Sequence, residues 1–265
     1  MPYDPSSILL TDRVAVVTGA GQGVGKATAL LLARFGARLA VCDRVAERLD
    51  ETEAELAAGG QPALACHLDV RDGEAVSAFL ADVVATCDRV DVLVNNADGT
   101  FFAPFLEVSE KGEAALVAEN FSQVTALVRG VMPLMPEGGA IVNLTSIEAH
   151  QAAPGFAIYG AMKAALAHLT RTLALELAPK GIRVNAIAPD AVPTGGDEDV
   201  RGEMLAAGAE YDPAVVPPLG YMGTPDDVAA AVLFLASDLS RFVTGTTIHV
   251  DGGNWAAGGW RRMAT

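Results

Sequence analysis

Cysteine, positive charge and long apolar runs are all scarce in this sequence. It contains three cysteines, Cys42, Cys66 and Cys87, with no C-x-x-C pair and no cluster of His and Cys. Three scattered cysteines do not form a disulfide framework, and without clustered ligands we expect no metal site. The 33 Asp and Glu residues outnumber the 18 Lys and Arg residues, giving a net charge of −15. Because nucleic acid and anionic membranes attract basic surfaces, we expect neither as a partner.

The longest apolar run, near residues 228–236, is far shorter than the roughly 18 residues of a membrane-spanning helix. Residues 1–12 carry no basic cluster before an apolar segment, so we predict no signal peptide. Together with the few cysteines, this favours a cytoplasmic protein. Hydrophobic residues still make up 51% of the chain, which is ample for a core and excludes a disordered protein.

Short apolar runs alternate with longer segments of helical periodicity along the chain. Continuous apolar strands separated by helices are typical of a parallel sheet covered on both faces. We predict one domain over residues 1–265, a Rossmann-type α/β fold with a doubly wound parallel sheet of about seven strands. The segment 190–218, rich in Pro, Gly and acidic residues, is predicted to be a substrate lid. The predicted strands are 13–18, 37–42, 62–67, 90–94, 140–144, 182–187 and 246–250, and the predicted helices 23–35, 45–58, 73–87, 109–135 in two pieces, 158–178 and 225–237.

The first predicted strand runs directly into a glycine-rich turn at 18–25 (TGAGQGVG) and then into a helix. Glycine lets the backbone turn tightly and approach a ligand, and a helix N-terminus offers N–H groups to a pyrophosphate. The spacing G-x-x-x-G-x-G differs from the common G-x-G-x-x-G, and a purely structural turn is the alternative. The strand–turn–helix context favours dinucleotide binding. The binding residues expected here are Gly19, Gln22, Gly23, Val24 and Gly25.

Acidic residues follow the next two predicted strands. Asp43 lies 24 residues after Gly19, where a carboxylate would bond the ribose hydroxyls of NAD and repel the extra phosphate of NADP. Arg44 comes next and would instead pair with that phosphate, so NADP is the alternative to the favoured NAD. Asp69 would accept a hydrogen bond from adenine. For both acids, a helix-capping role is the alternative.

Tyr159 and Lys163 are four residues apart and therefore share one face of a predicted helix. A free tyrosine has a pKa of about 10, and a fixed ammonium nearby stabilises the phenolate. The phenol can then exchange a proton with an alcohol or a ketone. Ser146, upstream at the end of the fifth predicted strand, would hold the same substrate oxygen. A solvated helix pair and a turn or cap serine are the plainer interpretations.

Together these motifs resemble the classical short-chain dehydrogenase/reductase family over essentially the full chain. The resemblance implies that Tyr159 is the general acid/base and that Ser146 orients the substrate carbonyl. Lys163 would bond the nicotinamide ribose and lower the Tyr159 pKa, and Asn120 would hold a proton-relay water, with a helix kink as its alternative role. Further implied cofactor contacts are Val70, Asn96, Ala97, Val192 and Thr194. The matching segments are TGAGQGVG at 18–25, LDV at 68–70, NNA at 95–97, Asn120, Ser146 with Tyr159 and Lys163, RVNAIAP at 183–189 and VTGTTIHVDGG at 243–253.

Two positions depart from the family pattern, because Asp98 and Asp190 stand where the family has glycine. We expect them to add negative charge to the wall near the nicotinamide. Family members that reduce acyl carrier protein substrates dock an acidic partner on basic residues, whereas the turn 136–139 has none. Acidic residues in the predicted lid would also oppose such docking. They are Asp197, Glu198, Asp199 and Glu203.

The favoured function is therefore NAD(H)-dependent interconversion of a neutral, apolar secondary alcohol and its ketone, such as a steroid or an alicyclic compound. The alternatives are an NADPH-dependent 3-oxoacyl-(acyl-carrier-protein) reductase, a non-catalytic NAD-binding sensor and a nucleotide-sugar epimerase or dehydratase. For His150, four residues after Ser146, an exposed loop position is favoured over a substrate contact. Aromatic residues that would line an apolar site, or simply pack in the core or between subunits, are Phe101, Phe102, Phe105, Trp255 and Trp260.

The helices predicted at 109–135 and 158–178 carry more apolar residues than one buried stripe requires. In the family, these two helices form one contact between subunits and the last strands with their tails form another. We therefore expect a homotetramer, with a dimer as the alternative.

Overall fold

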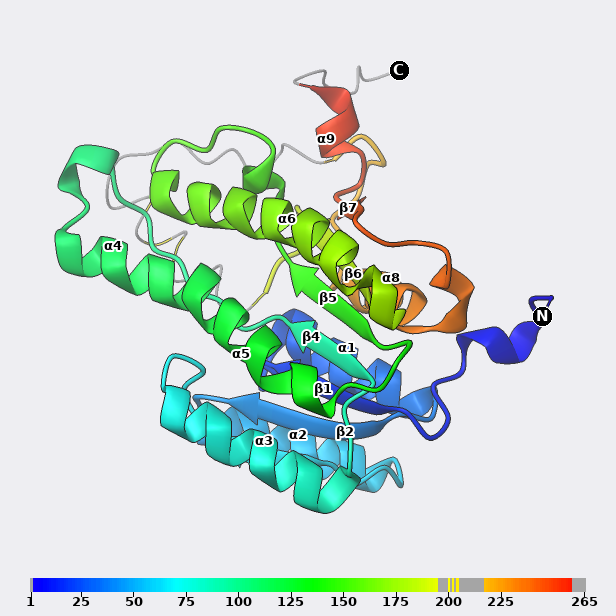
Figure 1. The fold of residues 1–265 in the computed structure, drawn as a ribbon. Helices are drawn as coiled ribbons and strands as arrows, with labels where there is room; N and C mark the ends of the chain where they lie inside the picture. Colours follow the sequence, from blue (N-terminus) through cyan, green and yellow to red (C-terminus); the bar gives the residue numbers. More distant parts are fainter. Residues whose placement is uncertain (1, 195–199, 201, 203, 205–216, 259–265) are drawn as a thin grey trace.

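The computed structural model describes residues 2–194, 200, 202, 204 and 217–258. Within these residues, seven parallel strands form one sheet in the order β3-β2-β1-β4-β5-β6-β7 (Figure 1). The strand order reverses between β1 and β4, and in open α/β sheets ligands bind beside such a reversal, at the carboxyl ends of the strands. The strands are β1 Val14–Thr18, β2 Arg38–Asp43, β3 Leu64–His67, β4 Val92–Asn95, β5 Ala140–Leu144, β6 Arg183–Pro189 and β7 Thr247–Val250.

Helices cover both faces of the sheet, as Figure 1 shows. Hydrophobic contacts place α1, α2 and α8 on one face and α3, α5 and α6 on the other. The helices are α1 Gly23–Arg34, α2 Ala46–Ala58, α3 Gly73–Cys87, α4 Glu110–Val117, α5 Gln123–Val131, α6 Ala157–Leu177, α8 Pro225–Ala236 and α9 Asn254–Ala257. A π-helical turn, η3 Ala118–Ser122, joins α4 to α5, and a 3₁₀ turn, η5 Ile147–Ala149, follows β5.

The central strands are largely apolar because their side chains alternate between two buried faces. All five residues of β1 are buried. Ala15 and Val17 pack with the helices of one face, whereas Val14 and Val16 pack with those of the other. This alternation follows from the two-residue period of a strand, and it explains why β1 has no polar face.

The structure confirms the predicted fold class, with strand and helix boundaries that shift by at most two residues over most of the chain. The predicted helical region 109–135 is a continuous path of α4, η3 and α5, so its two pieces are joined by a π turn rather than by a loop. The short helix α9 was not predicted. Of the predicted lid, only residues 190–194, 200, 202, 204, 217 and 218 are among the described residues.

Two features are absent from the described residues: a membrane-spanning helix and a cluster of metal ligands. No described helix is long and apolar enough to cross a membrane. In the same part of the chain, no three His, Cys, Asp or Glu side chains lie close enough together to hold a metal ion.

Candidate functional site

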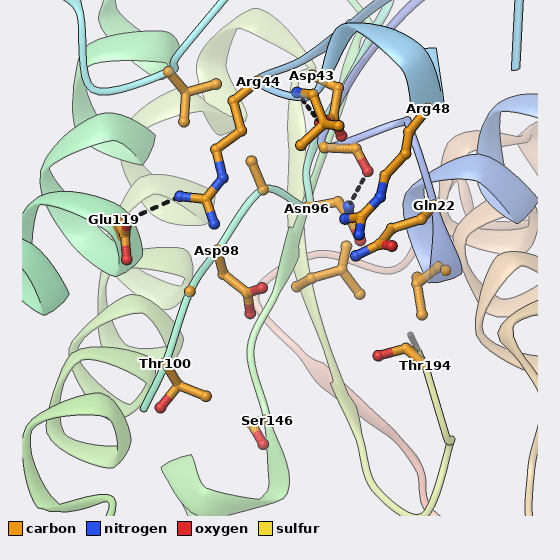
Figure 2. Close-up of a pocket in the computed structure, with 18 of the residues that line it drawn as sticks. Gln22, Asp43, Arg44, Arg48, Asn96, Asp98, Thr100, Glu119, Ser146 and Thr194 are labelled. Atoms are coloured by element: carbon orange, nitrogen blue, oxygen red, sulfur yellow. Dashed lines mark hydrogen bonds and ion pairs between the residues drawn. The ribbon is translucent and has the colours of Figure 1, made fainter. Parts of the chain in front are cut away.

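A cleft of about 460 Å³ lies at the carboxyl ends of the strands, beside the β1–β4 reversal. Figure 2 shows its labelled side chains converging from β1, β2, β4 and β5 and from the segments that follow them. The volume falls in the range of small-molecule and cofactor sites. Sequence-predicted residues that line the cleft are Gly19, Gln22, Gly23, Val24, Asp43, Arg44, Asp69, Val70, Asn96, Ala97, Ser146, Tyr159, Val192 and Thr194.

The glycine-rich turn needs glycine for close approach at two places. Gly19 has a φ of +65°, in the left-handed region. A Cβ on Gly25 would overlap the carbonyl oxygen of Gly19 and the side-chain amide of Asn96. That amide donates hydrogen bonds to the carbonyls of Thr18, at 2.9 Å, and Gly19, at 3.1 Å. Asn96 therefore fixes the turn by its hydrogen bonds, and Gly25 allows the close packing that these bonds require.

Thr18 ties the end of β1 to the end of β4. Its hydroxyl oxygen accepts hydrogen bonds from the backbone N–H groups of Asn96, at 3.1 Å, and Ala97, at 3.0 Å. The segment after β4 is thereby fixed beside the glycine-rich turn, and both line the cleft. Backbone donors, small residues and a helix N-terminus at this point suit the pyrophosphate and adenosine of a dinucleotide.

Asp43, at the end of β2, also supports the turn. One carboxylate oxygen accepts a hydrogen bond from the Gly21 N–H and the other from the Val45 N–H, both at 2.9 Å. Val45 is the residue from which α2 begins. The capping alternative is not what the structure shows, because Val45 is the N-cap of α2 and no side chain caps it. The Asp43 carboxylate instead ties the turn to the residue before α2 while lining the cleft.

Four charged side chains form an ionic network at the end of the cleft that follows β2 and β3. Glu119 on η3 accepts hydrogen bonds through one oxygen from Arg44, at 3.3 Å, and Arg71, at 2.7 Å (Figure 2 shows the Arg44 contact). Arg71 also binds Asp69, and these hydrogen bonds hold the Asp69 pKa below its usual value. Asp69 does not cap the next helix, because Asp72 does so. The sequence motifs gave no signal for Glu119 or Arg71.

Lys163 is a buried ammonium rather than part of a solvated helix pair. Its side chain is 2% exposed, and its Nζ lies 5.4 Å from the centre of the Tyr159 ring. The same Nζ donates to the carbonyl of Leu144 at 3.0 Å and binds the carboxylate of Asp98 at 2.7 Å. A charge held this close to the phenol is the arrangement that favours proton exchange by tyrosine.

Ser146 follows β5 and is buried on the wall of the same cleft. Its hydroxyl donates to the carboxylate of Glu148, and its oxygen accepts the Glu148 backbone N–H at the start of η5. The capping alternative thus describes part of what Ser146 does. Glu148 is a further acidic neighbour that the sequence analysis did not single out.

Asn120 lies inside the π turn and is buried. Its amide nitrogen donates to the carbonyls of Gly99, at 2.8 Å, and Leu116, at 2.9 Å. Its side-chain oxygen is buried with no hydrogen-bond partner among the described residues. The local helix distortion suggested for Asn120 is present as the π turn, and the orphaned oxygen is compatible with the expected water site.

Asp98 and Asp190 both have polar partners. Asp98 lines the cleft (Figure 2) and binds Lys163. Asp190 accepts a hydrogen bond from the Asn254 side chain at 2.7 Å and from the Ala191 N–H at 2.8 Å. Of the two departures from the family pattern, the charge of Asp98 is the one compensated by a buried ammonium.

The exposed-loop interpretation of His150 is wrong. Its ring is half-buried and packs 4.8 Å from the ring of His249, while Trp255 stacks on His249 at 5.4 Å. The Nε2 atoms of both histidines are buried without a hydrogen-bond partner in the described part of the chain. Burial, followed by the neighbouring His249 and Arg171, lowers the His150 pKa.

The candidate aromatic walls divide into three groups. Phe102 packs edge-on against Phe156 with ring centres 5.6 Å apart. Phe105 is 60% exposed and Trp255 is 42% exposed. Phe101 is half-buried, and Trp260 and the four predicted lid acids lie outside the described residues. Among the described residues, none of the four remaining aromatic side chains lines this cleft.

Comparison with known proteins places this architecture in a family. Residues 19–254 match the family model described as Enoyl-(Acyl carrier protein) reductase. An uncharacterized oxidoreductase of Mycobacterium tuberculosis is 40% identical over 92% of each chain. The chain belongs to the classical short-chain dehydrogenase/reductase family. Like other members of this family, it is an oxidoreductase of small-molecule CH–OH groups that uses NAD(P).

Two further family members differ in the substrates that their names state. A 3-oxoacyl-[acyl-carrier-protein] reductase of Thermotoga maritima is 38% identical over 92% of this chain and 98% of the relative. A solved 7α-hydroxysteroid dehydrogenase, in complex with NADH and 7-oxo glycochenodeoxycholic acid, is 31% identical with a TM-score of 0.87. That alignment covers 95% of this chain and 98% of the dehydrogenase.

Proposed function

We propose that this family member interconverts a neutral, apolar secondary alcohol and its ketone with NAD(H), within a single cytoplasmic domain. The observation that carries the proposal is the buried Lys163 ammonium, 5.4 Å from the ring of Tyr159, a residue that lines the cleft together with Ser146. An ammonium held next to a phenol suits acid–base exchange at a substrate oxygen.

Each polar side chain on that wall has a distinct task in this proposal. Tyr159 takes the proton of an alcohol, or returns one to a ketone oxygen. Ser146 holds the same oxygen by a hydrogen bond, and Lys163 stabilises the phenolate. Asn120 links this wall to the β4–α4 segment through Gly99 and offers its orphaned oxygen to a relay water. NAD, when bound, supplies the hydride acceptor or donor.

The glycine-rich turn fits a dinucleotide, because it lines the cleft and leads directly into the N-terminus of α1. Gly19, Gln22, Gly23 and Val24 would hold the pyrophosphate, and Val192 and Thr194, which line the same cleft, would hold the carboxamide. The adenine would lie near Asp69, Val70, Asn96 and Ala97.

The charges at the adenosine end support NAD over NADP. Asp43 lines the cleft with its carboxylate, which would repel a 2′-phosphate. Arg44, Arg48 and Arg71 all line the cleft and would attract that phosphate. Two of them, Arg44 and Arg71, contact Glu119. A phosphate would have to compete with Glu119 for both guanidinium groups.

The charges near the reacting oxygen support a neutral substrate. Glu148 contacts Ser146 and Asp98 contacts Lys163, so an anionic group approaching this wall meets two carboxylates. The steroid dehydrogenase named above supports an apolar alicyclic substrate. The carrier-protein reductases among the relatives support the second candidate, an NADPH-dependent 3-oxoacyl reductase.

A substrate panel tests the proposal directly. Purified protein is incubated with NAD or NADP and a series of cyclic and steroid secondary alcohols, and with NADH or NADPH and the matching ketones and a 3-oxoacyl thioester. We expect turnover of neutral alicyclic compounds with NAD(H). Preferred turnover of the thioester with NADPH would establish the second candidate instead.

Tyr159→Phe tests the chemistry independently of the substrate. Loss of the hydroxyl removes the acid–base group while keeping the ring, so kcat should fall at least about a hundredfold. NADH binding, followed by protein fluorescence, should stay within about twofold of wild type. Near wild-type turnover in this variant would contradict the proposed mechanism.

A further inference from the structure

The carboxylate of Asp98, which lines the cleft, is the ionic partner of the buried Lys163 ammonium. Asp98 Oδ2 lies 2.7 Å from Lys163 Nζ, while the two side chains are 41% and 2% exposed. Asp98 is separated from Lys163 by 65 residues of sequence, and it comes from the segment between β4 and α4 rather than from α6. The pair therefore bridges the two sides of the site.

The backbone on both sides of Asp98 is fixed by hydrogen bonds. Thr18 binds the backbone N–H of Ala97, the preceding residue, and Asn120 binds the carbonyl of Gly99, the following residue. A Cβ on Gly99 would overlap the Glu119 carboxylate, so this segment packs directly against Glu119. Asp98 is thus presented to Lys163 by a segment that is fixed at both ends.

From this geometry we propose that Asp98 is a positioning residue that holds the Lys163 ammonium and offsets its charge beside Tyr159. The inference rests on the proposed function, in which Lys163 stabilises the Tyr159 phenolate. A carboxylate paired with the ammonium offsets part of its charge and so weakens that stabilisation. The site therefore works as a base at higher pH than it would with a neutral residue at position 98.

The Asp98 charge should also affect the relative affinities for the oxidised and reduced cofactor. The nicotinamide ring of NAD⁺ carries a positive charge that NADH lacks. A carboxylate on the cleft wall attracts the oxidised form more than the reduced form, because the adenosine and pyrophosphate parts are common to both. Asp98 therefore raises the affinity for NAD⁺ relative to that for NADH, which favours alcohol oxidation.

The other titratable groups near this wall contact residues other than Lys163. Glu148 on η5 contacts Ser146, and Glu119 on η3 contacts Arg44 and Arg71. Asp190 after β6 binds Asn254, and His150 after η5 packs against His249. Within the described residues, Asp98 is the acidic side chain in ionic contact with Lys163.

The test uses Asp98→Asn, which keeps the shape of the side chain, and Asp98→Gly, which restores the residue of the family pattern. In each, the pH at half-maximal kcat for alcohol oxidation should fall by about one unit. The ratio of the NAD⁺ to the NADH dissociation constant, measured calorimetrically, should rise by roughly three- to tenfold. Thermal melting checks that both variants are folded.

Glu137→Gln is the matched control, because Glu137 is an exposed carboxylate before β5, at the opposite end of the sheet. It should move neither quantity. An unchanged pH profile or an unchanged dissociation-constant ratio in folded Asp98→Asn and Asp98→Gly would overturn the inference, as would equal shifts in Glu137→Gln. If Tyr159→Phe remains active, the proposed function fails; if it is inactive while the Asp98 variants show no shift, this inference alone fails.

Discussion

The guanidinium of Arg44 lies 3.3 Å from the carboxylate of Glu119, across the end of the cleft where a dinucleotide would place its adenosine. Arg71 contacts the same oxygen at 2.7 Å. A single acid on a π turn thus neutralises two cations that come from other elements. We therefore expect cofactor choice to depend on Glu119 as well as on Asp43.

This arrangement predicts the response of cofactor preference to two substitutions. Asp43→Ala removes the repulsion of a 2′-phosphate and should lower the NAD-to-NADP ratio of kcat/KM by roughly ten- to a hundredfold. Glu119→Gln releases Arg44 and Arg71 and should lower the ratio by roughly three- to tenfold. Glu51→Gln, on the exposed side of α2, is the control and should leave the ratio unchanged. A wild-type preference for NADP would contradict the assignment of Asp43 and Glu119.

Gly25→Ala should weaken cofactor binding by roughly tenfold or more, because the added methyl group overlaps the Gly19 carbonyl and forces the turn apart. Isothermal titration with NADH measures the loss. Gly73→Ala places the same methyl group at the start of α3, where no atom lies within 4 Å of it. Equal NADH affinity in the two variants would show that the turn does not bind the dinucleotide.

The pH dependence of stability should reflect His150. Burial and the neighbouring His249 lower its pKa in the folded protein, so the unfolded chain binds the proton more readily. Stability is therefore present above about pH 6.5, the ordinary histidine value, and falls as the pH drops below it. His150→Asn should flatten the fall in Tm between pH 7 and pH 5.

Calorimetric melting across that pH range checks this expectation. His168→Asn, which removes an exposed imidazole from α6, should leave the slope as it is in wild type. A slope that is identical in the His150 variant and in wild type would remove His150 as the source.

We propose that the protein is a homotetramer, a prediction supported by large apolar side chains left uncovered in one chain. Leu175 on α6 is 77% exposed, and Phe242 before β7 is 98% exposed. Light scattering after size exclusion at micromolar concentration should give about four chain masses. Leu175→Glu should lower the mass by burying a charge at the helix contact. A wild-type mass of one chain would contradict both the tetramer and the dimer.

Periodicity and turn chemistry were sufficient to predict the sheet. The buried alternation in β1 appears in the sequence as an uninterrupted apolar run, and the glycine-rich turn appears as local spacing. Both features depend on residues close together in the chain. The cleft residues that follow strands β1, β2 and β4 could be predicted for the same reason, since parallel strands bring their carboxyl ends to one edge.

The missed features are pairings between distant residues. Glu119 was not singled out because its meaning depends on Arg44 and Arg71, which are 75 and 48 residues away. Asp98 was recognised as unusual, but its contact with Lys163 required the fold. His150 was placed on an exposed loop because the strand that covers it, β7, lies 97 or more residues later. The burial of Lys163 was likewise not evident from the sequence, because it depends on residues distant in the chain, such as Asp98.

In the π turn at Ala118–Ser122, two consecutive side chains reach different partners: Glu119 binds two guanidinium groups, and Asn120 binds two backbone carbonyls. A regular α-helix advances about 100° per residue, so the wider turn sets the angular offset between these two side chains and α5. Shortening the turn by one residue would rotate one part of the helix against the other by that amount. Natural insertions and deletions should therefore be tolerated in the exposed loops of this chain long before they are tolerated in this turn.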